Sequence, residues 1–172
     1  MNYTDIHYPD IADGPGCRVS VFVSGCDLHC PGCFNEVAWD FDSGDPLDDE
    51  IEQHIMELLE KPWIAGLTVL GGEPMHPRNT TGVLRLCRLA KQRCPDKDVW
   101  VYSGHTLERL EDMAADDPAL DEMLYAPDSP VDVIVDGPFI EALKNVTLRF
   151  RGSSNQVIRD MHLFRELNKT PL

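Results

Sequence analysis

The sequence has 172 residues, enough for one domain whose hydrophobic core needs no disulfide bonds. Its 30 Asp and Glu side chains outnumber the 15 Lys and Arg side chains, which gives a formal net charge of −15 at pH 7. This charge repels phosphate groups and therefore argues against nucleic acid or an anionic membrane surface as a partner. The sequence has no long apolar run and no signal-peptide pattern, so we expect a single cytoplasmic domain over residues 1–172.

Short runs of β-branched residues alternate with segments of helical periodicity along the chain. Strands are predicted at 18–23, 66–70, 99–102 and 131–135. Helices are predicted to begin at Asp45-Pro46, near Thr81, at Thr106 and at Asp117-Pro118. The last part is less regular, with strands expected near 147–150 and 156–158 before a short helix.

Strands that alternate with helices are typical of a parallel sheet with right-handed crossovers. A complete eight-fold barrel needs about 250 residues, so this chain has room only for an open or partial TIM-like barrel with outer helices. Each predicted strand ends in a turn that contains glycine, and α/β folds bind ligands at the carboxyl ends of parallel strands. We therefore expect four turns to share one site: Ser24-Gly25, Gly71-Gly72, Ser103-Gly104 and Asp136-Gly137.

Three of the six cysteines form a compact motif with the spacing C-x3-C-x2-C: Cys26, Cys30 and Cys33. Clustered cysteines in a chain that needs no bridges indicate metal ligation or redox chemistry. Three thiolates can hold three irons of a [4Fe-4S] cluster and leave the fourth iron open, which is typical of a catalytic centre. If His29 or a distant cysteine supplied a fourth ligand, the motif would instead be a structural zinc site.

The segment from Asp13-Gly14-Pro15-Gly16-Cys17-Arg18 to Cys33-Phe34-Asn35 resembles radical S-adenosylmethionine enzymes, specifically the glycyl-radical activating enzymes. Three later segments, at 71–77, 135–139 and 151–156, resemble the subfamily that activates anaerobic (class III) ribonucleoside-triphosphate reductase. The resemblance covers nearly the whole chain. It implies a partial barrel and an oxidoreductase that cleaves S-adenosyl-L-methionine reductively at a [4Fe-4S] cluster. The product would be a glycyl radical on the large subunit of the reductase.

The resemblance also implies roles for individual residues. The metal ligands would be Cys26, Cys30 and Cys33. The residues expected at the bound S-adenosylmethionine are Gly32, Cys33, Phe34, Gly71, Gly72, Glu73, Ser103 and Asp136. The Glu73 carboxylate is a plausible acceptor for the substrate ammonium, while Ser103 and Asp136 are candidates for ribose or cation contact.

Several of these residues also have purely structural interpretations. Phe34 could be a core aromatic residue that anchors the cysteine loop. Ser103 and Asp136 could be turn or cap residues. We expect Arg18 to brace the cysteine loop, and the scattered cysteines Cys17, Cys87 and Cys94 to have no ligand role.

Residues 78–97 contain six Lys or Arg and one Asp, a local charge of +5 in an acidic chain. The segment could be a solvated helix face, or a docking patch for an acidic electron donor such as a reduced flavodoxin. We expect the 151–156 loop to border the mouth of the active site, because no structural role within the loop itself explains its Gly-Ser-Ser composition.

Two other functions stay open from the sequence. The chain could activate a different glycyl-radical enzyme, although the Arg-Gly-Ser-Ser-Asn-Gln segment at 151–156 argues against this. It could also be a non-catalytic zinc or electron-carrier module. Zinc in a colourless protein after anaerobic purification would favour the module, whereas a brown protein that cleaves S-adenosylmethionine when reduced would exclude both a zinc module and an ordinary electron carrier.

Overall fold

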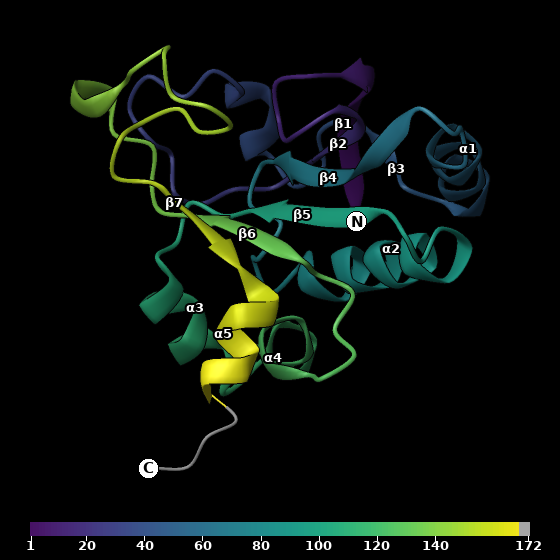
Figure 1. The fold of residues 1–172 in the computed structure, drawn as a ribbon. Helices are drawn as coiled ribbons and strands as arrows, with labels where there is room; N and C mark the ends of the chain where they lie inside the picture. Colours follow the sequence, from purple (N-terminus) through teal and green to yellow (C-terminus); the bar gives the residue numbers. More distant parts are fainter. Residues whose placement is uncertain (169–172) are drawn as a thin grey trace.

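The structure is a computed structural model that describes residues 1–168, and its centre is an open seven-stranded sheet (Figure 1). The strand order is β3-β1-β2-β4-β5-β6-β7. The strands are β1 (Asn2–Asp10), β2 (Cys17–Val23), β3 (Asp45–Pro46), β4 (Ile64–Gly71), β5 (Asp98–Tyr102), β6 (Val133–Asp136) and β7 (Val157–Asp160). Neighbouring strands are parallel from β2 to β6, whereas β1, β3 and β7 pair antiparallel at the edges. The predicted parallel sheet is thus confirmed for its four central strands, in a sheet that is mixed and open.

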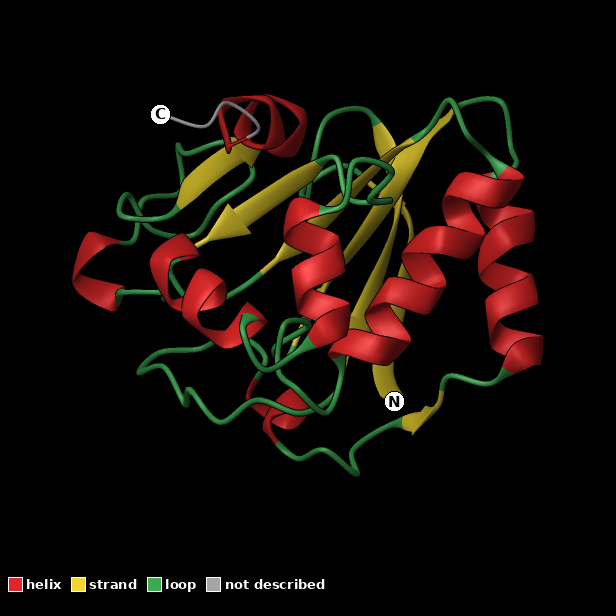
Figure 2. Cartoon of the chain, turned by 90° about the horizontal axis from the view of Figure 1, so that it is seen from below, coloured by secondary structure: helices red, strands yellow, loops and turns green. Residues whose placement is uncertain are grey.

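The α-helices gather on one side of the sheet (Figure 2). They are α1 (Asp49–Leu59), α2 (Thr80–Arg93), α3 (Leu107–Ala114), α4 (Pro118–Tyr125) and α5 (Met161–Asn168). Buried side chains of β2 and β4, such as Val19, Val21 and Val69, belong to one hydrophobic core with Ile55 of α1 and Leu86 of α2. Among residues 1–168, no helix combines the length and the apolar character that a membrane span requires.

Two local predictions need correction. Helix α1 does not begin at Asp45-Pro46, because the carboxylate of Asp48 caps it by accepting the backbone N–H groups of Glu50 and Ile51 at 3.1 and 3.0 Å. Residues 45–46 instead pair with the start of β1 as the short strand β3. Residues 147–150 form a loop rather than a strand.

The fold places the candidate site at one edge of the sheet. The segments that follow β2, β4, β5 and β6 all leave the sheet at the carboxyl ends of its parallel strands. In Figure 1 the long segment from 137 to 156 lies on the same side of the molecule as the segment after β2, which contains the cysteine motif. Two short 3-10 helices, η1 (Glu36–Trp39) and η2 (Glu141–Leu143), interrupt these two segments.

Candidate cofactor site

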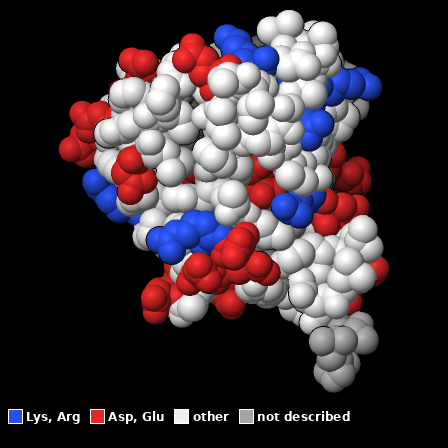
Figure 3. All heavy atoms as spheres, turned by 90° about the vertical axis from the view of Figure 1, so that its left-hand side faces the viewer, with Lys and Arg blue, Asp and Glu red and all other residues white. Residues whose placement is uncertain are grey.

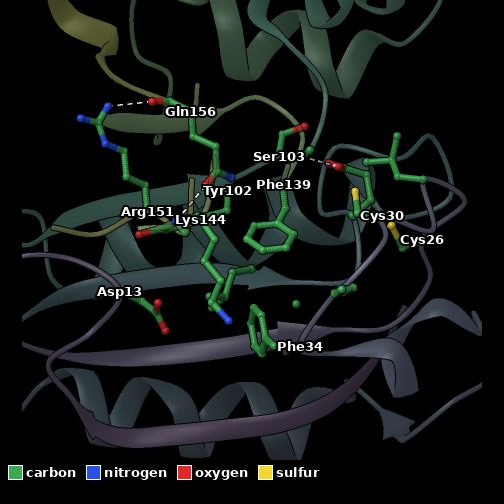
Figure 4. Close-up of a pocket in the computed structure, with 18 of the residues that line it drawn as sticks. Asp13, Cys26, Cys30, Phe34, Tyr102, Ser103, Phe139, Lys144, Arg151 and Gln156 are labelled. Carbon is green, nitrogen blue, oxygen red and sulfur yellow. Dashed lines mark hydrogen bonds between the residues drawn. The ribbon is translucent and has the colours of Figure 1, made fainter. Parts of the chain in front are cut away.

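A cavity of about 420 Å³ lies at the carboxyl ends of β4 and β5 (Figure 4). Its wall is built from the cysteine loop, the turns at 71–73 and 102–104, and the segment from 139 to 156. Seven of the eight residues predicted at S-adenosylmethionine line this cavity together: Gly32, Cys33, Phe34, Gly71, Gly72, Glu73 and Ser103. Cys26 and Cys30 also face this cavity.

The three clustered cysteines share the cavity wall, whereas Cys87 and Cys94 are buried in the hydrophobic core. Cys26 is buried, which raises the pKa of its thiol to about 11, and Cys30 and Cys33 are partly exposed. No three Cys, His, Asp or Glu side chains within residues 1–168 lie close enough together to form a finished metal site. The donor set nevertheless fits an iron–sulfur cluster, because three thiols on one short loop face the same cavity.

Backbone hydrogen bonds fix the start of the cysteine loop against η1. The amide of Gly25 donates to the carbonyl of Ala38 at 2.7 Å, and the amide of Cys26 donates to that of Trp39 at 3.0 Å. The ring of His29 packs on Trp39 with a centroid distance of 4.6 Å and does not belong to the cavity wall. This position gives no support to His29 as a fourth metal ligand.

The turn after β4 requires glycine at both of its first positions. Gly71 has a φ of +110°, and a Cβ there would lie 2.7 Å from the Cα of Phe22. A Cβ on Gly72 would lie 2.5 Å from the carbonyl oxygen of Gly25. The turn therefore packs directly on the end of β2, where the amide of Gly72 donates to the carbonyl of Val23 at 2.7 Å.

Glu73 connects two walls of the cavity. Its side chain is fully buried, its Oε1 accepts the amide of Met75 at 2.9 Å, and its Oε2 accepts the amide of Gly104 at 2.7 Å. Burial raises the pKa of this carboxyl to about 7, although these two hydrogen bonds oppose the shift. The geometry supports Glu73 as a positioning residue between the β4 and β5 turns. Its contact with a substrate ammonium stays a prediction.

The other candidates divide between the cavity and the sheet. Ser103 lines the cavity and its Oγ accepts the amide of His105 at 3.0 Å. Phe34 is 85% exposed at the cavity, so the interpretation as a core aromatic is wrong. Asp136 is not part of the cavity wall, because its carboxylate accepts Nε of Arg159 at 2.5 Å and the amide of Leu107 at 2.9 Å. Asp136 thus lies near Ser103 in the sheet but outside the cavity that the other candidates line.

Several cavity residues were not identified as candidates from the sequence. Asp13, Tyr102, Phe139 and Lys144 all line the wall (Figure 4). Burial, followed by a hydrogen bond with Asp10 and its charge, raises the pKa of Asp13 to about 7. Signals were available for Asp13 in the Asp13-Gly14-Pro15-Gly16 motif and for Phe139 in the 135–139 segment that resembles the subfamily. Tyr102 ends the predicted strand at 99–102, whereas Lys144 stands in a segment with no distinctive pattern.

The 151–156 loop lines the cavity as expected, but its polar composition does have a structural role, because its side chains form hydrogen bonds that shape the loop. The Oε1 of Gln156 accepts the amides of Gly152 and Ser153 at 2.8 and 3.1 Å, and its Nε2 donates to the carbonyl of Gly137 at 3.1 Å. The Oγ of the fully buried Ser153 accepts the amide of Ile140 at 3.2 Å. The polar side chains of Ser153 and Gln156 therefore stabilise the conformation of the loop and its contact with residues 137–140.

The predicted basic patch on α2 is neutralised in space. Arg85 lies 2.7 Å from Glu52 of α1, Lys91 lies 2.7 Å from Asp132, and Arg93 lies 2.5 Å from Glu60. Arg88 pairs with Glu122 of α4. Acids that are distant in sequence therefore pair with four of the six cations of residues 78–97, and each Lys or Arg within α2 itself has a carboxylate partner.

Comparison with known proteins agrees with this site. The family model of the 4Fe-4S single cluster domain matches residues 12–159. The chain is 41% identical over 160 residues to the anaerobic ribonucleoside-triphosphate reductase-activating protein of Vibrio cholerae, across 92% of this chain and 97% of that protein. The protein of the same name from Escherichia coli K12 is 39% identical over 163 residues (94% and 99%), and that of Enterobacteria phage T4 is 36% identical over 156 residues (91% and 92%). The chain belongs to the family of anaerobic ribonucleoside-triphosphate reductase-activating proteins, with a 4Fe-4S single cluster domain.

Proposed function

We propose that this protein activates an anaerobic ribonucleoside-triphosphate reductase by generating a glycyl radical on its large subunit. The observation that carries the proposal is the cavity shared by the C-x3-C-x2-C loop and the Gly71-Gly72-Glu73 turn. When bound, a reduced [4Fe-4S] cluster supplies the electron that cleaves S-adenosylmethionine, and the radical formed removes a hydrogen atom from a glycine. The names of the curated relatives support the reductase as the partner.

In this proposal Cys26, Cys30 and Cys33, whose side chains line the same cavity, would each bind one iron of the cluster. Glycines 71 and 72 offer backbone without side chains to the amino-acid part of S-adenosylmethionine. The carbonyl oxygens of this turn are then the acceptors for its ammonium group. Glu73 keeps the turn in place through the amides of Met75 and Gly104.

The rest of the wall orients the adenosine part and excludes water. The aromatic rings of Phe34 and Phe139 project into the cavity in Figure 4 and offer apolar surface for the adenine. Excluding water matters because an alkyl radical reacts with almost any neighbouring C–H bond. We also propose that the open sheet is one part of a barrel within a single domain, with the cavity on its inner side. A reduced flavodoxin-like protein stays our proposal for the electron donor.

The decisive experiment is anaerobic mixing of the reconstituted protein with the reductase, S-adenosylmethionine and reductant, followed by electron paramagnetic resonance. A glycyl-radical doublet that requires all components is the expected result. A protein that contains zinc and does not cleave S-adenosylmethionine would overturn the proposal in favour of a zinc module. Cleavage with no radical on this reductase would point to a different glycyl-radical enzyme.

A further inference from the structure

Asn79 stands at the start of α2, but its side chain does not cap that helix. Asparagine at this position commonly accepts a backbone amide of the first helical turn through its side-chain oxygen. Asp48, Thr106 and Asp117 do this for α1, α3 and α4, and their backbones are extended. Asn79 instead has a φ of −109° and a ψ of −31°, and its side chain makes no capping hydrogen bond with the described first turn of α2. The side chain is therefore available for another contact.

The side-chain amide of Asn79 joins two loops that are far apart in the sequence. Its Nδ2 donates to the backbone carbonyl of Ser24 at 2.9 Å and to that of Glu73 at 3.0 Å. Ser24 follows β2 and lies two positions before Cys26, whereas Glu73 belongs to the turn after β4. One NH2 group thus connects the start of the cysteine loop with the Gly71-Gly72-Glu73 turn.

This contact is buried, so water does not replace it. Asn79, Ser24 and Glu73 are each at most 2% exposed. Among residues 1–168 the carbonyl of Ser24 has no other donor, while that of Glu73 also accepts the amide of His76 at 3.1 Å. A buried carbonyl that loses its donor is destabilised. Replacing Asn79 therefore acts first on the start of the cysteine loop.

The backbone of Asn79 is itself fixed by α2. Its amide donates to the carbonyl of His76 at 2.7 Å, and its carbonyl accepts the amide of Val83 at 2.9 Å. Val83 and other buried side chains of α2 belong to the hydrophobic core. The donor group thus has a fixed position relative to the sheet, and the two loops are held relative to that position.

Asn79 acts from outside the cavity, whose described wall does not include it. Figure 3 shows a broad area of uncharged side chains on the side of the molecule where the cavity walls lie, with Lys and Arg side chains at its borders. The neutral amide of Asn79 suits this region, since it joins the loops without adding a charge beside the candidate cluster site. An ionised aspartate has nearly the same shape but no donor hydrogen, so it could make neither bond.

We infer that Asn79 is a positioning residue that sets the distance between the cysteine loop and the Gly71-Gly72-Glu73 turn. The inference rests on the proposed function. In that function the cysteine loop holds the cluster and the turn binds the amino-acid part of S-adenosylmethionine, so the two loops must be placed accurately against each other. A displacement of about 1 Å between reacting groups is enough to lower a rate by about 100-fold.

The test compares Asn79→Ala and Asn79→Asp with the wild type after anaerobic reconstitution. The measurements are iron and sulfide content, calorimetric titration with S-adenosylmethionine, and electron paramagnetic resonance of the reduced cluster with and without S-adenosylmethionine. Both variants should assemble the cluster, bind S-adenosylmethionine about tenfold more weakly and show a smaller change in the spectrum when it is added. Cleavage with dithionite should stay slow at saturating S-adenosylmethionine, because the bound molecule is misplaced.

The matched control is Ser129→Ala. The hydroxyl of the buried Ser129 donates to the backbone carbonyl of Met123 at 2.8 Å. This variant therefore also removes a buried side-chain donor to a carbonyl, but at the end of α4 and away from the described cavity wall. It should lower the midpoint of urea unfolding and leave the affinity for S-adenosylmethionine and the spectrum unchanged.

The possible failures can be told apart. Wild-type affinity and spectra in both Asn79 variants would overturn the inference and leave the proposed function intact. An equal loss of affinity in Ser129→Ala would also overturn it, since the effect would then follow from general stability. Failure of both Asn79 variants to fold or to assemble the cluster would overturn it in favour of a structural role. A wild-type protein that does not bind S-adenosylmethionine would overturn the proposed function itself.

Discussion

The guanidinium of Arg18 donates from Nε to Oγ1 of Thr68 at 2.7 Å, and the Thr68 hydroxyl in turn donates to the backbone carbonyl of Asp13 at 2.9 Å. Arg18 is fully buried, and its Nη1 lies 2.7 Å from Asp98. A Cβ on Gly14 would meet the Arg18 side chain at 2.7 Å, so the glycine allows the loop to pass over it. Arg18 therefore holds the loop at 13–16, and the expectation that it braces the cysteine loop is wrong.

Replacing Arg18 by Met should lower the free energy of unfolding by about 3 kcal/mol, because buried acceptors lose their donor. The displaced loop should also weaken binding of S-adenosylmethionine, since Asp13 lines the cavity. Urea denaturation and calorimetric titration measure the two effects. The control is Arg109→Met, at an exposed position of α3. A loss below about 1 kcal/mol would contradict the buried network as a support.

Each of Cys26→Ala, Cys30→Ala and Cys33→Ala should abolish the cluster and the cleavage of S-adenosylmethionine, because each removes one of three thiolate ligands. Cys87→Ala and Cys94→Ala should keep both, since these side chains pack in the hydrophobic core. Iron and sulfide content and product analysis after anaerobic reconstitution provide the measurement. Loss of the cluster in Cys87→Ala or Cys94→Ala, in a protein that is still folded, would refute the three-ligand assignment.

Gly72→Ala should cost about 2 to 3 kcal/mol and reduce binding of S-adenosylmethionine, because its Cβ would lie 2.5 Å from the backbone oxygen of Gly25. The matched control is Gly82→Ala in α2, where the three atoms nearest to the new Cβ all belong to the side chain of Met1, at 3.0 to 3.2 Å. There the better helix propensity of Ala should keep the stability change within about 1 kcal/mol. Thermal unfolding of the two variants side by side checks this difference.

The stability of the protein should fall as the pH rises through the titration of Asp13. The pKa of this carboxyl is raised from 3.8 to about 7 by burial and by Asp10. The folded chain therefore binds more protons than the unfolded chain between these values, and the free energy of unfolding decreases across that window. Asp13→Asn lacks this titration, so its stability advantage over the wild type should grow by about 2 to 4 kcal/mol between pH 4 and pH 8.

Urea denaturation at several pH values measures this difference. Asp128→Asn, at an exposed position, serves as the control and should show no such trend. An advantage of Asp13→Asn that does not change with pH would show that folding does not raise the pKa of this carboxyl.

The sequence predicts the central sheet well because its strands are short, β-branched and end in glycine turns. It does not predict β1, whose segment mixes Asp, His and Pro with apolar residues. That composition suits an antiparallel strand near the sheet edge, where partly exposed side chains replace the apolar run of a central strand. The strand predicted at 147–150 is wrong for the opposite reason. The local sequence favours a strand there, but hydrogen bonds to Tyr102 and within the loop stabilise a different conformation.

For the site, the motif residues are found from sequence because their spacing is short and local. Lys144 is not, because it reaches the cavity only through the folding of a distant segment, and Tyr102, beside the predicted Ser103-Gly104 turn, belongs to no motif of its own. Asp136 is predicted at the site because it is an acid at the end of a strand. Its carboxylate instead accepts a hydrogen bond from Arg159, which lies 23 positions later and could not be foreseen from the local sequence. The predicted positive surface of α2 is wrong for the same reason, since Glu52 and Glu122, which pair with its arginines, are distant in sequence and near only in space.

The position of the 139–156 wall has a consequence for how the protein is made. The cysteine loop is synthesised long before the opposite wall and before β7, which pairs with β6. The cavity is therefore incomplete until the chain has been made through β7. A cluster inserted before that point would stand open to water and oxidants on one side, so its insertion is best suited to a chain that already includes both walls.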